Sequence, residues 1–178
     1  MILQQYKIVF GGTMGSGKST AIRALSEIEV VGSEAVNTDA EAHTKAHTTV
    51  GIEYGEITLG DGVKVGLYGT PGQDRFDFIW SVICKGAIGT ILLIDHQAEN
   101  PLEDLAHYIA AFRNTNQNIV IGITHVDEKI ERPTLIYRDW LEQQDCNYPL
   151  FFVDARQQED VLLLVEAMVS STEVNLLS

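Results

Sequence analysis

Residues 12–19 read Gly-Thr-Met-Gly-Ser-Gly-Lys-Ser, and this stretch constrains the fold more than any other part of the chain. It matches the pattern G-x-x-x-x-G-K-[ST] of a phosphate-binding loop, which requires a strand before it and a helix after it. An apolar run over 6–11 predicts the strand, and the segment 19–28 predicts the helix. The alternative is an ordinary glycine-rich turn, but a chance match to the whole pattern is expected in on the order of a percent of chains this long.

Each part of this loop has an expected task. The glycines allow a tight turn whose backbone N–H groups point at phosphate oxygens. Lys18 supplies a positive charge to the β- and γ-phosphates, and the Ser19 hydroxyl is an oxygen ligand for Mg²⁺. The positive end of the following helix favours an anion at the same place. The residues expected to bind nucleotide here are Gly12, Met14, Gly15, Ser16, Gly17, Lys18, Ser19 and Thr20.

The charge of the chain restricts its partners. It has 25 acidic and 12 basic residues among 178, a net charge of −13. Such a chain is repelled by nucleic-acid backbones and anionic lipids, so we expect neither as a partner. Cys84 and Cys146 have neither metal-ligand spacing nor the pattern of a disulfide framework, which favours a reducing compartment. Without a signal peptide, lipidation motif or membrane-spanning run, we expect a cytoplasmic protein with no direct membrane anchor.

Apolar runs rich in β-branched residues predict six strands, over 6–11, 51–59, 64–68, 89–95, 118–124 and 150–153. Continuous apolar runs such as 91–94 are typical of parallel strands that are buried on both faces. Gly60-Asp61-Gly62 predicts a hairpin turn, and therefore one antiparallel edge strand. Residues 30–48 show little pattern, and we expect a long loop there.

Helical patterns separate several of these strands. Asn100-Pro101 is a helix start signal, Pro133 opens a second helix that runs to about Gln144, and an apolar stripe from Val161 to Val169 predicts the last one. Strands that alternate with helices make a doubly wound α/β domain, with ligands at the carboxyl ends of the strands. We expect one such domain over residues 1–178.

Four further segments follow the phosphate loop in a characteristic order. They are Thr48-Thr49-Val50-Gly51, Gly69-Thr70-Pro71-Gly72-Gln73, Thr124-His125-Val126-Asp127 and Asp154-Ala155-Arg156. In this order, the chain resembles the Ras-like small GTPases over essentially its whole length. The resemblance implies a P-loop NTPase G domain, with a six-stranded mostly parallel sheet and helices on both faces. It also implies GTP or GDP together with Mg²⁺ as cofactors.

The resemblance assigns tasks to single residues. Thr49 would reach Mg²⁺ and the γ-phosphate, Gly72 would sense the γ-phosphate, and Gln73 would orient the attacking water. Asp127 would accept two hydrogens from the guanine edge, and the Ala155 N–H would meet the guanine carbonyl. Gln73 and Lys18 are thereby implied as the catalytic residues, and Ser19 and Thr49 as the metal ligands. The nucleotide-binding set then also includes Thr49, Gly72, Thr124, His125, Asp127, Asp154, Ala155 and Arg156.

The chain also departs from the Ras-like pattern. Gly69 replaces an aspartate that supports Mg²⁺ through water, and Thr124-His125 replaces Asn-Lys in the base motif. Asp154-Ala155-Arg156 stands for Ser-Ala-Lys, and Met14 stands where many of these proteins have glycine. Together with Gly-Thr-Pro-Gly-Gln, these departures resemble a bacterial branch often encoded beside roadblock-type proteins. Regulatory or effector proteins, among them roadblock-type ones, are the implied partners.

Three functions are compatible with this pattern. The first is a GTP-hydrolysing switch with slow turnover, because no arginine lies between Glu27 and Tyr54 to stabilise the transition state. The second is a scaffold that binds nucleotide and barely hydrolyses it, which Gly69 and Met14 favour. The third is a small-molecule phosphotransferase, which leaves Asp127 without a task. The aromatic cluster from Phe76 to Trp80 is either core or a partner surface that responds to nucleotide.

Overall fold

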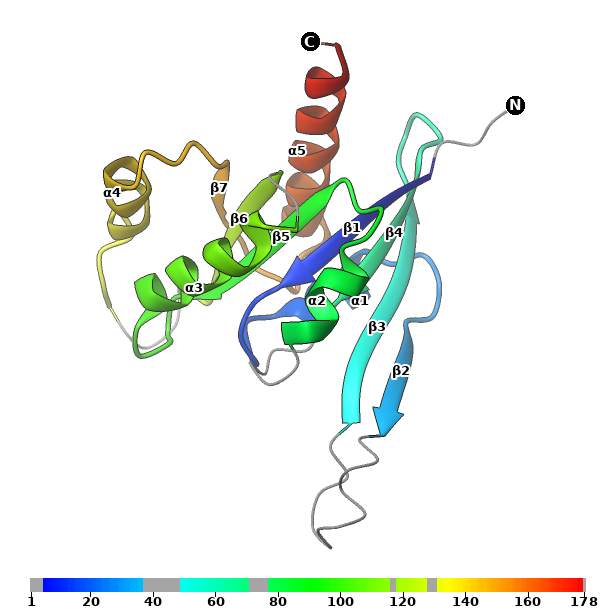
Figure 1. Ribbon diagram of the computed structural model, residues 1–178, viewed down its shortest axis with the longest axis horizontal. Coiled ribbons are helices and arrows are strands. Elements are labelled where there is room, and N and C mark those ends of the chain that lie inside the picture. The colour runs from blue at the N-terminus through cyan, green and yellow to red at the C-terminus, as the bar shows by residue number, and fades with distance from the viewer. Residues whose placement is uncertain (1–4, 37–48, 71–76, 116–117, 128–130, 178) are drawn as a thin grey trace, which may run out of the picture.

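The computed structural model describes residues 5–36, 49–70, 77–115, 118–127 and 131–177. Within them, seven strands form one sheet and five helices pack on it (Figure 1). The strands are β1 (Gln5–Gly11), β2 (Val31–Val36), β3 (Thr49–Thr58), β4 (Lys64–Gly69), β5 (Gly89–Asp95), β6 (Ile119–Thr124) and β7 (Leu150–Phe152). The helices are α1 (Lys18–Leu25), α2 (Asp77–Ile83), α3 (Pro101–Arg113), α4 (Ile136–Gln143) and α5 (Gln158–Leu177).

The sheet has the strand order β2-β3-β4-β1-β5-β6-β7. From β4 to β7 along this order, neighbouring strands pair in parallel. This arrangement confirms the mostly parallel α/β sheet of a P-loop NTPase that the sequence predicts. The predicted hairpin also forms, because β3 and β4 pair antiparallel around a turn in which the Leu59 N–H donates to the Val63 carbonyl at 2.8 Å.

Strand β2 corrects the sequence reading of this edge of the sheet. The expectation of six strands and a loop over 30–48 was wrong for Val31–Val36, which pairs antiparallel with β3 from Val31↔Tyr54 to Val36↔Thr49. Its sequence, Val-Gly-Ser-Glu-Ala-Val, gives only a weak strand signal, because glycine and polar residues interrupt it. The strand that runs antiparallel to its neighbours is therefore β3, which is second from the edge, and the edge strand is β2.

The two faces of the sheet are covered by different helices. Helices α1 and α5 pack on one face, where Ile8 and Phe10 of β1 point. Helices α2, α3 and α4 pack on the other face, where Val9 points. Because successive side chains of a strand alternate between faces, β1 contributes to both halves of the core. The phosphate loop follows β1, so it is held by a strand that is buried along most of its length.

The aromatic residues of α2 divide between core and surface. Trp80 is buried and stacks on Phe112 of α3, with 4.9 Å between ring centroids. Phe78 is 65% exposed. The segment thus supplies one core residue and one exposed residue, while Phe76 lies outside the described residues.

Helix boundaries follow the predicted signals with small shifts. Helix α3 begins at Pro101 as predicted, whereas α4 begins at Ile136 rather than at Pro133. Over the described ranges, no helix is both long enough and apolar enough to cross a bilayer.

Candidate nucleotide-binding site

The phosphate loop joins β1 to α1, and its glycines adopt backbone angles that other residues avoid. Gly12, Gly15 and Gly17 have φ values of 143°, 80° and 105°. A Cβ atom on Gly12 would overlap the carbonyl oxygen of Leu93, so this position also requires glycine for space. The loop therefore folds as the sequence pattern requires, because side chains are absent where the turn is tight and strained.

The start of α1 lies open for an anion. Gly17 occupies the N-cap position, and no side chain caps the first turn. In addition, the Ser16 hydroxyl oxygen is buried and has no hydrogen-bond partner among the described residues. Uncapped N–H groups and the helix dipole attract negative charge, so this end of α1 fits a phosphate group.

Lys18 folds back over the loop that precedes it. Its Nζ donates hydrogen bonds to the carbonyl oxygens of Gly12 and Thr13, the second at 2.7 Å, and the residue is only 8% exposed. Burial lowers the pKa of the Lys18 amine to about 8, although the negative charge of Glu53 acts in the opposite direction. A buried amine with two carbonyl partners is favourably placed to exchange one of them for a phosphate oxygen.

Ser19 contacts a carboxylate that the sequence reading missed. Its Oγ donates a hydrogen bond to Glu53 Oε1, and Glu53 lies in β3 directly opposite Gly69 of β4. The other carboxylate oxygen, Oε2, is buried without a hydrogen-bond partner among the described residues. The signal in the sequence was an acidic residue four positions after Thr49 in an otherwise strand-like run, but only the strand register connects it with Ser19.

The expected base-binding segment, residues 124–127, is hydrogen-bonded to the phosphate loop. The Thr124 hydroxyl donates to the Ser16 carbonyl at 2.8 Å, and the His125 Nε2–H donates to the Gly15 carbonyl at 3.0 Å. His125 has φ of 59°, a left-handed conformation that is rare outside glycine. Gln97 holds this conformation, because its side-chain amide donates to the His125 carbonyl at 2.8 Å. The sequence reading missed Gln97, since nothing in its surroundings marks it.

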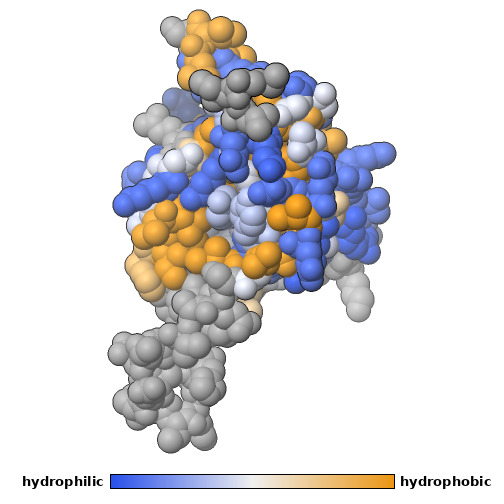
Figure 2. All heavy atoms as spheres, turned by 90° about the vertical axis from the view of Figure 1, so that its right-hand side faces the viewer, coloured by the Kyte–Doolittle hydropathy of each residue, from blue (hydrophilic) through white to orange (hydrophobic). Residues whose placement is uncertain are grey.

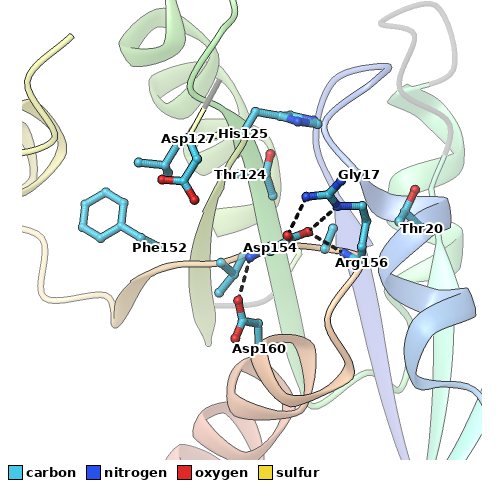
Figure 3. Close-up of a pocket in the computed structure, with 12 residues that line it drawn as sticks. Gly17, Thr20, Thr124, His125, Asp127, Phe152, Asp154, Arg156 and Asp160 are labelled. Atoms are coloured by element: carbon cyan, nitrogen blue, oxygen red, sulfur yellow. Dashed lines mark hydrogen bonds and ion pairs between the residues drawn. The ribbon is translucent and has the colours of Figure 1, made fainter. Parts of the chain in front are cut away.

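A pocket of about 320 Å³ opens beside these two loops (Figure 3). Figure 3 shows Asp127 and Phe152 on one side of it, and Thr20 and Arg156 on the other. Phe152 is 38% exposed and forms part of the wall, a task that the sequence reading did not foresee. The pocket is lined by Gly17, Thr20, Thr124, His125, Val126, Asp127, Phe152, Val153, Asp154, Ala155, Arg156 and Asp160.

The loop after β7 forms the floor of the pocket through contacts of its own. Arg156 donates to both Asp154 oxygens, at 2.9 and 2.8 Å, and these bonds hold the pKa of the Asp154 carboxyl at about 2. Asp160 at the start of α5 accepts a hydrogen bond from the Asp154 N–H at 2.8 Å. These hydrogen bonds fix the backbone on both sides of Ala155. Ala155 also lies close to the phosphate loop, because a Cβ atom added to Gly17 would be 3.0 Å from the Cβ of Ala155.

Four of the expected site residues either do not line this pocket or lie outside the described part of the chain. Met14 is 66% exposed at the tip of the phosphate loop. The backbone of Thr49 begins β3 and pairs with Val36, whereas its side chain is outside the described part of the structure. Gly72 and Gln73 fall among residues 71–76, which lie outside the described residues. The segment that leads to them is anchored at Thr70, whose hydroxyl donates to the Phe10 carbonyl at 2.9 Å.

Comparison with known proteins relates this chain to nucleotide-binding proteins. A family model described as "Conserved hypothetical ATP binding protein" matches residues 28–169, a range that begins after the phosphate loop. The Ras-related protein RABA1b of Arabidopsis thaliana is 28% identical over 164 residues, which cover 87% of this chain and 70% of the relative. The Ras-related protein Rab-11A of Dictyostelium discoideum is 29% identical over 153 residues, covering 84% and 66%.

A third relative, the Ras-related protein RABA1a of Arabidopsis thaliana, is 28% identical over 120 residues, and the match spans half of its length. These matches support a Ras-like kinship for the chain, as its motif order predicts. They do not support the expected bacterial branch associated with roadblock-type proteins.

Proposed function

Because the chain belongs to the family described as conserved hypothetical ATP binding proteins, we propose that it binds a nucleotide at the described site, and that the nucleotide is GTP or GDP with Mg²⁺. The observation that carries this proposal is the junction of the phosphate loop with the pocket. Thr124 and His125 donate hydrogen bonds to the carbonyl oxygens of Ser16 and Gly15 in the phosphate loop. These bonds would hold Asp127 at a fixed distance from the bound phosphates. A single ligand can therefore place its phosphates on the loop and its base beside Asp127.

The choice of guanine follows from the hydrogen-bonding groups of the base. Guanine presents an N–H and an amino group on one edge, and a carboxylate such as Asp127 accepts from both. Adenine presents a ring nitrogen acceptor there, which would face the carboxylate without a donor. A site built around such hydrogen bonds rejects the analogue that leaves its polar groups unpaired. The family description names ATP, so adenine is the competing base.

Binding of the diphosphates of guanosine, adenosine and xanthosine tests the base choice. We expect wild type to bind GDP at least about 100-fold more tightly than ADP. Asp127→Asn should lose GDP and gain xanthosine diphosphate, because an amide donates to the carbonyl that replaces the guanine amino group. Asp139→Asn, at an exposed aspartate of α4, is the matched control and should behave like wild type. Equal affinities for ADP and GDP in wild type would overturn the guanine assignment.

Residues of the chain would hold Mg²⁺ in a way that suits the ion. Mg²⁺ prefers hard oxygen ligands and would neutralise charge on the phosphate oxygens. The Ser19 hydroxyl and a buried, unpaired carboxylate oxygen lie together beside the loop, which fits this preference. Thr49 is proposed as a further ligand on the strength of the Ras-like motif order.

We further propose slow hydrolysis of GTP and signalling through partner proteins that distinguish GTP from GDP. Gln73 would orient the attacking water, and Lys18 would stabilise charge on the phosphates. Regulatory or effector proteins, including roadblock-type ones, remain the proposed partners, and a cytoplasmic location remains the proposed one. Phosphate release in a single turnover tests the hydrolysis, since Gln73→Ala should slow it at least tenfold.

A nucleotide-dependent scaffold without hydrolysis is the second candidate. It is favoured by Gly69, which offers no carboxylate at the end of β4, and by the exposed Met14 at the loop tip. Rates of phosphate release that are equal and close to zero in wild type and Gln73→Ala would select the scaffold over the hydrolysing switch.

A further inference from the structure

We propose that Glu53 is the carboxylate that supports Mg²⁺ at this site, and that it does so from β3 in place of an aspartate at the end of β4. The inference rests on the proposed nucleotide binding. In P-loop NTPases, the metal is held by the loop Ser or Thr and by an aspartate at the end of a neighbouring strand. In this chain that aspartate position is Gly69, and the carboxylate comes from the next strand instead.

The strand register brings Glu53 to this position. Glu53 and Gly69 are direct partners in the antiparallel β3–β4 ladder. A Cβ atom on Gly69 would lie 3.5 Å from the Cβ of Glu53 and 2.9 Å from the Ile22 Cδ1 atom. The space beside Gly69 is therefore bordered by Glu53, and a glycine at 69 leaves room for the longer side chain to reach toward Ser19.

The contacts of Glu53 are incomplete in a way that points to a cation. One oxygen, Oε1, accepts a hydrogen bond from Ser19, the residue expected to bind the metal. The other, Oε2, is buried with no hydrogen-bond partner among the described residues. A buried carboxylate oxygen without a partner is strongly unfavourable, so a hydrogen-bond donor or a positive group is expected beside it.

Lys18 does not supply that positive group by direct contact. Its Nζ donates to the carbonyl oxygens of Gly12 and Thr13. Its amine is expected to turn to phosphate oxygens when nucleotide binds. A hard divalent cation between Ser19, Glu53 and the phosphates satisfies the unpaired oxygen with the kind of ligand that Mg²⁺ prefers.

The test is the release of a fluorescent N-methylanthraniloyl-GDP over a range of buffered free Mg²⁺. In wild type, Mg²⁺ should slow release, with a defined half-maximal concentration. Glu53→Gln keeps the size of the side chain and an oxygen that can accept from Ser19, but it removes the negative charge and replaces the second oxygen with an NH₂ donor. It should raise the half-maximal Mg²⁺ concentration by 10- to 100-fold, which is the usual effect of losing a residue that supports a metal. In excess EDTA, the variant should release nucleotide no faster than wild type.

Two further variants make the result specific. Glu56→Gln removes a negative charge from the same strand, but residues three apart on a strand point to opposite faces, so its Mg²⁺ dependence should match wild type. The double variant Glu53→Gln with Gly69→Asp returns a carboxylate to the end of β4, where the closest atom to an added Cβ is the side-chain tip of Ile22, at 2.9 Å. This double variant should recover at least part of the lost Mg²⁺ sensitivity. Thermal unfolding of each variant checks that it is folded.

Two results would overturn the proposal. The first is an unchanged half-maximal Mg²⁺ concentration in Glu53→Gln. The second is faster release by this variant in EDTA to the same extent as in Mg²⁺, which would make Glu53 a structural partner of Ser19. Because the inference concerns phosphates and metal, the ADP analogue serves equally if the base proves to be adenine. Failure of the guanine assignment is therefore distinguishable from failure of the Glu53 assignment.

Discussion

The hydroxyl of Thr124, at the end of β6, donates a hydrogen bond of 2.8 Å to the carbonyl oxygen of Ser16 in the phosphate loop. Thr124 is 1% exposed, so water does not replace this bond when it is lost. One buried contact thus links two segments that are 108 residues apart in the chain and that border the two halves of the proposed ligand.

Thr124→Val removes this link while keeping the shape of the side chain. A buried carbonyl left unpaired costs about 1–3 kcal/mol, so we expect the free energy of unfolding to fall by that amount. GDP affinity should fall by about tenfold, since 1.4 kcal/mol corresponds to a factor of ten. Urea unfolding and calorimetric titration measure the two effects. Thr58→Val, at an exposed threonine of β3, should change neither.

Gly17→Ala should damage both folding and nucleotide binding. Gly17 has φ of 105°, and an added Cβ would lie 3.0 Å from the Cβ of Ala155. Forcing alanine into such a conformation costs about 1–3 kcal/mol before any shift of the loop after β7. Gly60→Ala is the comparison, because no atom lies within 4 Å of a Cβ there. Equal melting temperatures for the two variants would contradict the strain argument.

Phe152→Ala should weaken nucleotide binding without much loss of stability. Phe152 is partly exposed and forms a wall of the pocket, so its ring is available to the base. Contact between an aromatic ring and a base is worth about 1–3 kcal/mol, and we expect a loss of affinity of about tenfold or more. Phe78→Ala, at an exposed phenylalanine of α2, serves as the control. Unchanged GDP affinity in Phe152→Ala would mean that the base lies elsewhere.

His96 should make the stability of the protein depend on pH. Its ring is buried, its Nδ1 lies 2.6 Å from the Tyr137 hydroxyl, and burial lowers the pKa of His96 below its ordinary value. The unfolded chain then takes up a proton near pH 6.5 that the folded chain resists, so stability is lost as the pH falls below that value.

Urea unfolding at pH 8 and pH 5.5 tests this dependence. Wild type should be less stable at pH 5.5, and His96→Gln should show a smaller difference between the two values. The comparison at two pH values within each protein removes any constant effect of the substitution. A pH dependence that is identical in both proteins would rule out His96 as its source.

The phosphate loop and the parallel sheet could be predicted from the sequence because their signals are local. Glycine spacing, a preceding apolar run and a following helix are all contained within about 25 residues of each other. Glu53 and Gln97 could not be found in this way. Glu53 reaches Ser19 only through the register of β3 against β4, and Gln97 acts by holding a backbone conformation at His125.

Strand β2 escaped prediction for a related reason. As the edge strand, it pairs only with β3, and its polar residues and glycine give little periodic pattern. By contrast, β5 is buried along nearly its whole length, and its apolar run identifies it at once. Sequence patterns report burial more faithfully than they report hydrogen bonding, so the centre of the sheet was clearer than its edge.

Helix α5 runs along its face of the sheet from the pocket, at the carboxyl ends of the strands, towards the amino end of β6. Asp160 in its first turn lines the pocket, whereas Thr172 accepts a hydrogen bond from Asn118, just before β6 begins. At 1.5 Å per residue, about 25 Å of helix separates Asp160 from Leu177. Val174, Leu176 and Leu177 near the end of α5 are exposed. Figure 1 marks this end of the chain at the top of the molecule, and Figure 2 shows hydrophobic side chains at the top. A dye or a sensor-chip linker attached at this end would leave the pocket facing the solution, so immobilised protein can be titrated without the tether competing for the ligand.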